Sequence, residues 1–152
     1  MTCTRITNYL SNFSENLSEL IEDNRLTVEA FAESVDIAFS EVYRYLRKEY
    51  MPKLSNLIKI ADTYGYSLDF LIGLIPFPEN AKFKTASPFS EQLKKHLKEK
   101  GVSRYRMSKE TGISLNRIDS WYHGEFTPSL EKAIKLKKYF DCTLDYLFGR
   151  EA

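Results

Sequence analysis

The sequence is poor in residues that would cross-link the chain or anchor it. Cys3 and Cys142 are the only cysteines among 152 residues, which favours free thiols over a disulfide framework. His96 and His123 stand apart, without partners at metal-ligand spacing, and we interpret both as ordinary surface residues. No apolar run reaches 18 residues, and no basic and apolar leader opens the chain. These absences predict a cytoplasmic protein with no metal, no cofactor and no membrane association.

Catalytic signatures are also missing. We find no glycine-rich phosphate loop and no Ser/His/Asp or Cys/His set placed by a plausible scaffold. Carboxylates are abundant, but their spacing is that of solvated helix faces. We therefore expect no enzymatic activity.

The sequence has instead an internal repeat. Residues 13–74 align without a gap on residues 89–150 when shifted by 76 positions. The aligned pairs that are identical or similar include Phe13/Phe89, Leu26/Val102, Phe31/Met107, Val42/Ile118, Pro52/Pro128, Leu68/Leu144 and Gly73/Gly149. Recurring apolar positions indicate two copies of one core, so function should lie where the copies differ.

Two copies are too few for a stacked solenoid, so each must bury a core of its own. We expect domains at residues 1–74 and 89–152. The linker, residues 75–88, contains three prolines, which exclude a helix interior. Phe77 and Phe83 are unusual for a flexible tether, and at least one of them should pack on a domain.

Periodicity and capping signals predict five helices in each copy and an all-α fold. In the first copy the helix starts are expected near Ser14, Thr27, Ala38, Pro52 and Ser67. In the second they are expected at Ser87-Pro88, Ser103, Ser114, Thr127-Pro128 and Thr143. The spacing of Ile6, Leu10, Phe13 and Leu17 either extends the first helix backwards or forms an extra one.

The second and third helices of the second copy form an informative unit. Ser108 is a small residue where two helices must approach, and Gly112 follows at the turn. Ile118 and Trp121 would lock the next helix onto the previous one. This spacing is typical of a helix-turn-helix.

With the tail segments Thr127–Glu131 and Thr143–Gly149, the second copy resembles the lambda-repressor/Cro-like, or XRE-type, DNA-binding domains. In the first copy the resemblance is strongest over residues 52–62 and 67–73. It implies two tandem five-helix domains whose third helix enters the major groove of double-stranded DNA.

The family's docking mode implies a set of DNA-binding positions in the second copy. Arg117 suits guanine, Asn116 suits adenine, and Leu115 could pack on a thymine methyl group. Arg104 occupies the position that usually contacts phosphate. The full set is Ser103, Arg104, Ser114, Leu115, Asn116, Arg117, Ser120, His123 and Thr127.

The two copies carry opposite charge. Residues 13–74 contain 6 Lys or Arg and 11 Asp or Glu, whereas residues 89–152 contain 13 and 9. The basic copy suits a polyanion and the acidic copy is repelled by one.

The first copy also departs from the family's pattern. Asp36 replaces the turn glycine, Glu41 stands where Arg117 stands in the second copy, and exposed aromatics are expected at Phe39 and Tyr43. Against this, a basic rim remains, formed by Arg44, Arg47, Lys48 and Lys53. A DNA contact, a protein interface and a structural remnant all stay open for this copy, and the residues concerned are Phe39, Ser40, Tyr43, Arg44, Arg47 and Lys48.

Together these features predict a sequence-specific DNA-binding transcriptional regulator of repressor type. Base reading is expected from the second copy, and the first copy would support a homodimer, a protein partner or an auxiliary DNA contact. The alternative is a protein-interaction module, such as an antitoxin or the target of an anti-repressor, that uses the acidic first copy.

Overall fold

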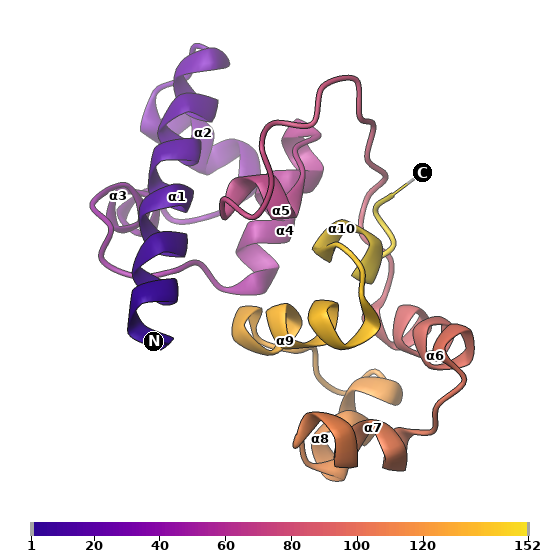
Figure 1. Cartoon of the computed structure of the whole chain (residues 1–152). Coiled ribbons are helices and arrows are strands. Elements are labelled where there is room, and N and C mark those ends of the chain that lie inside the picture. The colour runs from indigo at the N-terminus through magenta and orange to yellow at the C-terminus, as the bar shows by residue number, and fades with distance from the viewer. Residues whose placement is uncertain (1, 152) are drawn as a thin grey trace. The chain divides into compact units, whose positions relative to one another are not determined.

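The computed structural model describes the backbone of residues 2–151 and the side chains of residues 8–151. It divides the chain into a first unit, residues 1–82, and a second unit, residues 83–152 (Figure 1). Within the described residues every regular element is a helix, apart from one isolated β-bridge. The fold is therefore all-α, as the sequence predicts.

Five helices build each unit. In the first unit they are α1 (Thr2–Asp23), α2 (Val28–Val35), α3 (Phe39–Leu46), α4 (Leu54–Tyr64) and α5 (Leu68–Leu71). In the second unit they are α6 (Phe89–Lys100), α7 (Arg104–Thr111), α8 (Leu115–Tyr122), α9 (Leu130–Phe140) and α10 (Leu144–Leu147). The last four helices of the two units have equal lengths and are offset by the same 76 residues.

The first helices differ. The start expected near Ser14 is wrong, because α1 begins at Thr2 and runs for 22 residues. Of the two alternatives for the N-terminal apolar spacing, the backward extension is the one found. The side chain of Ile6 lies outside the described residues.

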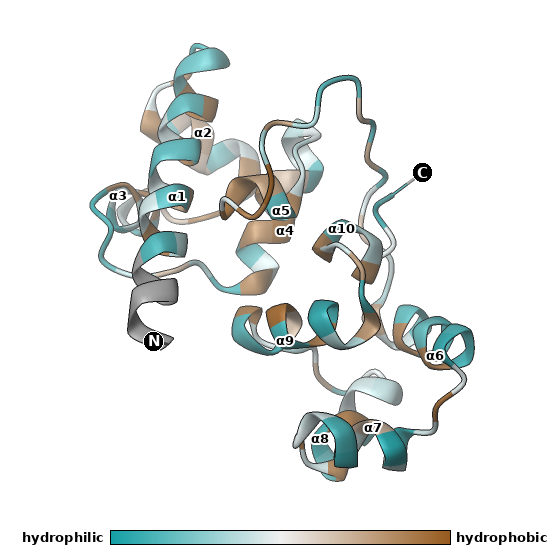
Figure 2. Cartoon of the chain, viewed as in Figure 1, coloured by the Kyte–Doolittle hydropathy of each residue, from teal (hydrophilic) through white to brown (hydrophobic). Residues whose placement is uncertain are grey.

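Each unit has its own core. In the first unit the fully buried side chains include Phe13, Phe31, Val42, Tyr45 and Leu57. In the second they include Leu93, Met107, Ile118, Leu136 and Leu147. Hydrophobic residues occupy one face of most helices and hydrophilic residues the other (Figure 2), which is the amphipathic pattern of helices that pack on neighbours.

Side chains cap the helices at several of the expected residues. Thr27, Ser67, Ser103, Ser114 and Thr143 each accept a hydrogen bond from a backbone N–H of the helix that follows. Such caps satisfy amide groups that have no partner within the helix.

Three predicted starts are displaced by one or two residues. Helix α9 begins after Ser129 rather than at Thr127-Pro128, because the Ser129 hydroxyl accepts from the amide of Lys132. In the first unit α4 likewise begins after Lys53, and Pro88 is the N-cap of α6 instead of its first residue. The Ser87 amide is engaged elsewhere and donates to the Phe148 carbonyl at 3.0 Å.

The segment between the two helical cores is partly ordered by both phenylalanines. Phe77 packs edge-on against Phe70, with ring centroids 5.2 Å apart. Phe83 forms a β-bridge with Glu151, and the guanidinium of Arg150 lies 5.3 Å from its ring. The expectation that at least one of them packs on a domain is confirmed.

The expectation of a surface position for His96 is wrong. His96 is buried, its Nε2 donates to the Leu147 carbonyl at 3.0 Å, and its ring packs against Phe140 and Tyr146. His123 is exposed, as expected, and Cys142 is half-buried. The misjudgement of His96 arose from its residue type, since its place beside Leu93 and Leu97 is on the inner face of α6.

Candidate nucleic-acid interface

Helices α7 and α8 are joined by a tight and well-bonded turn. Gly112 ends α7 in the left-handed backbone region, with φ of 76°. The Ser108 hydroxyl donates to the Ile113 carbonyl at 2.6 Å, so this small side chain also ties the turn to α7. Ile118 and Trp121 are buried and fix α8 against the rest of the unit.

Because those two residues face the core, the opposite side of α8 faces solvent. Asn116 and Arg117 are exposed, Leu115 retains 37% of its surface, and Ser120 is half-buried. Four of the predicted DNA-binding residues therefore lie on or beside one accessible helix face, as positions that share a helix surface should.

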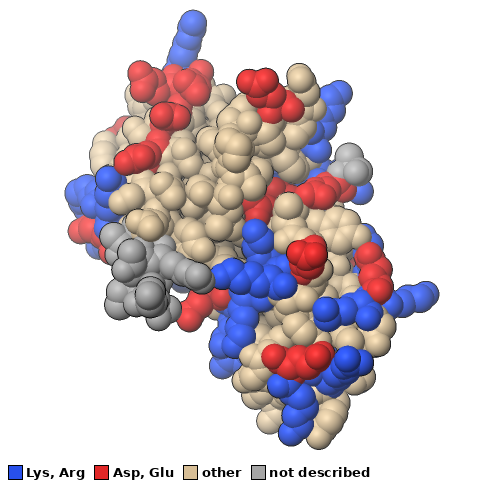
Figure 3. Space-filling view, viewed as in Figure 1, with Lys and Arg blue, Asp and Glu red and all other residues tan. Residues whose placement is uncertain are grey.

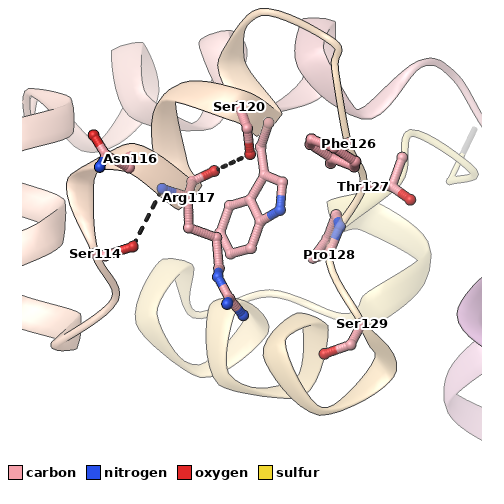
Figure 4. A pocket seen from close by; sticks show the side chains of 9 residues that line it. Ser114, Asn116, Arg117, Ser120, Phe126, Thr127, Pro128 and Ser129 are labelled. Atoms are coloured by element: carbon pink, nitrogen blue, oxygen red, sulfur yellow. Dashed lines mark hydrogen bonds between the residues drawn. The ribbon is translucent and has the colours of Figure 1, made fainter.

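A groove of about 540 Å³ opens beside this face. It lies between α8 and the segment that leads into α9 (Figure 4). Nine residues line it, namely Ser114, Asn116, Arg117, Ser120, Trp121, Phe126, Thr127, Pro128 and Ser129. The groove thus brings five of the predicted DNA-binding residues together, and the guanidinium of Arg117 extends along it.

Two helix N-termini point their capping serines into the groove. The Arg117 amide donates to Ser114 Oγ at 3.2 Å, and the Lys132 amide donates to Ser129 Oγ at 3.2 Å. Each hydroxyl accepts a bond from its helix and keeps its proton for a further acceptor. The N-terminal end of a helix carries partial positive charge, so both ends and Arg117 favour an anion such as phosphate.

Arg104 lies outside this groove, on another flank of α8. Its guanidinium donates to Asp119 at 3.0 Å and stacks over the ring of Tyr122 at 4.0 Å. His123 Nε2 is 3.4 Å from the same Nη1. Arg104 thus clamps α7 to α8, and a phosphate at this position would share it with Asp119.

The other two predicted serines use their hydroxyls locally. Ser103 caps α7 by accepting from the Arg106 amide at 3.1 Å. Ser120 donates to the Arg117 carbonyl at 2.6 Å, which leaves its lone pairs to accept from a base. The structure therefore places the hydroxyl proton of Ser120 inside the helix, a detail that residue type alone does not give.

Sequence reasoning missed four residues that line the groove and one that borders α8. Trp121 was assigned to the core only, whereas Phe126, Pro128 and Ser129 were not considered as site residues. Asp119, the partner of Arg104, was also omitted. The Thr-Pro-Ser sequence before an apolar run was a signal for Ser129, since serine is a preferred N-cap; the exposure of Phe126 had no such signal.

The corresponding face of the first unit is built from different chemistry. Tyr50 donates to Glu41 Oε1 at 3.4 Å, which links the positions equivalent to Phe126 and Arg117. A hydrogen bond with Tyr50 raises the pKa of Arg44. The caps also differ, because Ala38 and Lys53 provide no side-chain hydrogen bond at the starts of α3 and α4.

Carboxylates also engage the basic rim of the first unit. Arg47 pairs with Glu49 at 3.2 Å and Lys48 pairs with Glu15 at 3.7 Å. Ser40 is exposed. Arg47 and Lys48 are therefore each compensated by a neighbouring carboxylate, as Arg104 is by Asp119 in the second unit.

Phe39 and Tyr43 form an aromatic pair on α3. Their ring centroids are 6.2 Å apart, and Phe39 keeps 56% of its surface exposed. The charge of Glu29, whose carboxylate accepts from the Tyr43 hydroxyl at 3.2 Å, raises the pKa of Tyr43. The pair is thus an apolar spot bordered by a carboxylate.

The two units of the folded protein differ in the charge of their surfaces. The visible face of the second unit carries a dense group of Lys and Arg, and acidic side chains gather on the first (Figure 3). Among residues 8–151, no group of three or more His, Cys, Asp or Glu side chains is arranged to hold a metal ion. None of the helices in the described part of the chain has both the length and the apolar character needed to cross a bilayer.

Comparison with known proteins identifies a helix-turn-helix domain in each unit. Residues 92–152 match the Cro/C1-type HTH DNA-binding domain family, and residues 17–71 match a helix-turn-helix family. The chain is similar to the uncharacterized HTH-type transcriptional regulator YobD of Bacillus subtilis (strain 168), with 31% identity over 67 residues. That match covers 44% of the chain and 60% of the relative's length. No solved structure gives a significant match. The protein therefore carries two Cro/C1-type helix-turn-helix domains in tandem.

Proposed function

We propose that the protein is a transcriptional regulator that binds a specific double-stranded DNA sequence through its second unit. Helix α8 enters the major groove and reads base edges with Leu115, Asn116, Arg117 and Ser120. Ser103, Arg104, His123 and Thr127 border this face and contact the sugar–phosphate backbone. Contacts to the DNA backbone would fix the register of the protein on the duplex, and contacts to base edges would determine which sequence is bound.

The groove beside α8 carries the proposal. It joins an exposed arginine, an exposed asparagine and two serine-capped helix starts in the unit that is rich in Lys and Arg. Bidentate pairing of Arg with guanine and of Asn with adenine is the usual chemistry of base reading. The same positions in the first unit hold Glu41 and Ser40, and Glu41 accepts from Tyr50.

A charge exchange between the units tests which one reads DNA. The full chain would be incubated with random duplex DNA and the bound sequences determined. We expect the natural protein to enrich one sequence, Arg117→Glu to abolish the enrichment, and the matched variant Glu41→Arg to leave that sequence unchanged. Enrichment that survives Arg117→Glu and changes with Glu41→Arg would assign base reading to the first unit instead.

We propose a repressor role, because a protein bound over a promoter blocks polymerase by occupying the site and needs no further chemistry. A reporter gene with the selected sequence across its promoter should fall in expression when the chain is supplied. Arg117→Glu should restore expression, whereas a rise with the natural protein would indicate an activator.

A second role is proposed for the first unit, as a surface for self-association or for a protein partner. The Phe39–Tyr43 pair supports it, although only Phe39 is exposed as the sequence predicts and Tyr43 is half-buried, since aromatic residues are enriched at protein interfaces. Sedimentation of the full chain should reveal a dimer that Phe39→Ala weakens and that 0.5 M salt leaves intact. A monomer at all concentrations would reject self-association and leave a separate protein partner, which affinity capture with and without Phe39→Ala would detect.

A further inference from the structure

We propose that Phe126 is a specificity-determining residue that packs its ring on a thymine methyl group. This inference deepens the proposed function and rests on it. It adds to the face of α8 an apolar reader that comes from the loop after the helix.

The exposure of Phe126 is the first observation. The ring keeps 68% of its surface accessible, the largest value among the exposed large hydrophobic side chains of the described residues. Single exposed apolar residues are common on protein surfaces, so exposure alone would decide nothing. The setting of the ring is what distinguishes it.

Phe126 lines the groove beside α8, across from Arg117 (Figure 4). The side chains around it that can meet bases are polar, namely Asn116, Arg117 and Ser120. In the major groove the C5 methyl of thymine is the apolar group on a base edge, and Phe is among the residues that contact it. An apolar ring among these polar side chains therefore fits that one group.

The backbone of Phe126 is fixed before any ligand arrives. Ser120 O accepts from the amides of Glu125, at 2.9 Å, and Phe126, at 3.4 Å. Pro128 follows two residues later, is buried, and restricts its own backbone and that of Thr127. A side chain on a fixed loop loses little conformational freedom on binding, which favours a specific contact.

The equivalent residue in the first unit shows that this loop can also turn its aromatic inward. Tyr50 is 38% exposed, packs edge-on against Tyr45 at 5.8 Å, and donates to Glu41. Phe126 has no hydroxyl, and Arg117 replaces the acceptor. The second unit therefore lacks the hydrogen bond that holds Tyr50 against α3 in the first unit, and the ring of Phe126 stays exposed.

Sequence selection with the full chain tests the role. The natural protein, Phe126→Ala and the control Tyr105→Ala would each select from random duplex DNA. Tyr105 is 61% exposed in the same unit but does not line the groove. We expect Phe126→Ala to lose a preference for thymine at one position and keep the others, and Tyr105→Ala to keep them all.

Methyl substitution then identifies the contacted group. Replacing that thymine with uracil should weaken binding of the natural protein about fourfold, the value of one buried methyl group. The same replacement should leave Phe126→Ala unaffected, and 5-methylcytosine should bind the natural protein better than cytosine. Thermal unfolding of Phe126→Ala should match the natural protein, because the ring is exposed.

Two results would overturn the inference alone. Either Phe126→Ala selects the same sequence with every preference intact or uniformly weaker, or the natural protein binds uracil as well as thymine. If the natural protein selects no sequence at all, the proposed function fails and this inference fails with it.

Discussion

His96 illustrates how one buried residue couples the stability of a unit to pH. Burial lowers the pKa of His96 below its usual value of 6.5, because the protonated ring is poorly solvated between Phe140 and Tyr146. The unfolded chain then binds a proton more readily than the folded one. The stability from this group is complete above pH 6.5 and falls as the pH drops toward the folded-state pKa.

We predict that the second unit becomes less stable below about pH 6.5. The variant His96→Leu, which takes Leu20 from the same position of the first unit, should lose this dependence. At pH 8 it should be destabilised by about 1–3 kcal/mol, because the Leu147 carbonyl loses its donor. Thermal melts from pH 5 to 8 measure both effects, and His123→Gln, an exposed position, should retain the pH dependence.

Substitution of Arg117 tests whether this single side chain recognises a base. If it binds one guanine bidentately, Arg117→Ala should cost about 1–3 kcal/mol of binding free energy and relax the preference at one base pair. Titration of the selected sequence and of its single-base variants measures this. An equal loss for all of them would make Arg117 a backbone contact.

At the scale of the helix, the capping serines distinguish the two units. Ser114→Ala installs the residue that Ala38 provides in the first unit and removes the bond to the Arg117 amide. We predict a loss of about 1 kcal/mol in the stability of the second unit. The reciprocal Ala38→Ser should stabilise the first unit by a similar amount, and denaturant unfolding of both variants provides the comparison.

Two glycines that end helical segments allow the cost of backbone strain to be distinguished from the cost of steric crowding. Gly112 and Gly149 both have left-handed φ, of 76° and 72°, yet a Cβ at Gly112 meets no atom within 4 Å. At Gly149 it would lie 2.8 Å from the Gln92 side chain. We predict that Gly112→Ala costs about 1 kcal/mol and that Gly149→Ala costs more, as measured by denaturant unfolding. Equal losses would show that Gln92 moves aside freely.

For the whole molecule, the separation of charge predicts a salt response. Six phosphate contacts by the second unit would give a slope of about −5 for the logarithm of the binding constant against the logarithm of salt concentration. We expect Arg104→Ala to reduce the slope by about one, because it removes one phosphate contact. Lys53→Ala in the first unit should leave it unchanged, and filter binding from 50 to 200 mM salt measures all three proteins.

Much of this architecture could be predicted from the chain alone. Apolar residues that recur 76 positions apart require two similar cores, and hydroxyl residues before apolar runs mark helix starts. These are local signals, set by periodicity and by backbone amides that need partners. A local signal misplaces a helix start where two candidate caps stand close together, as Thr127 and Ser129 do before α9.

The duplication, the all-α class, the opposite charges and the solvent-facing side of α8 can all be derived from residue order. The packing of the helices, by contrast, establishes which side chains meet. It buried His96 under Leu147, paired Arg104 with Asp119, and opened a groove between Arg117 and Phe126. Such contacts join residues far apart in the chain or on different elements, and they depend on how helices pack, which no local pattern encodes.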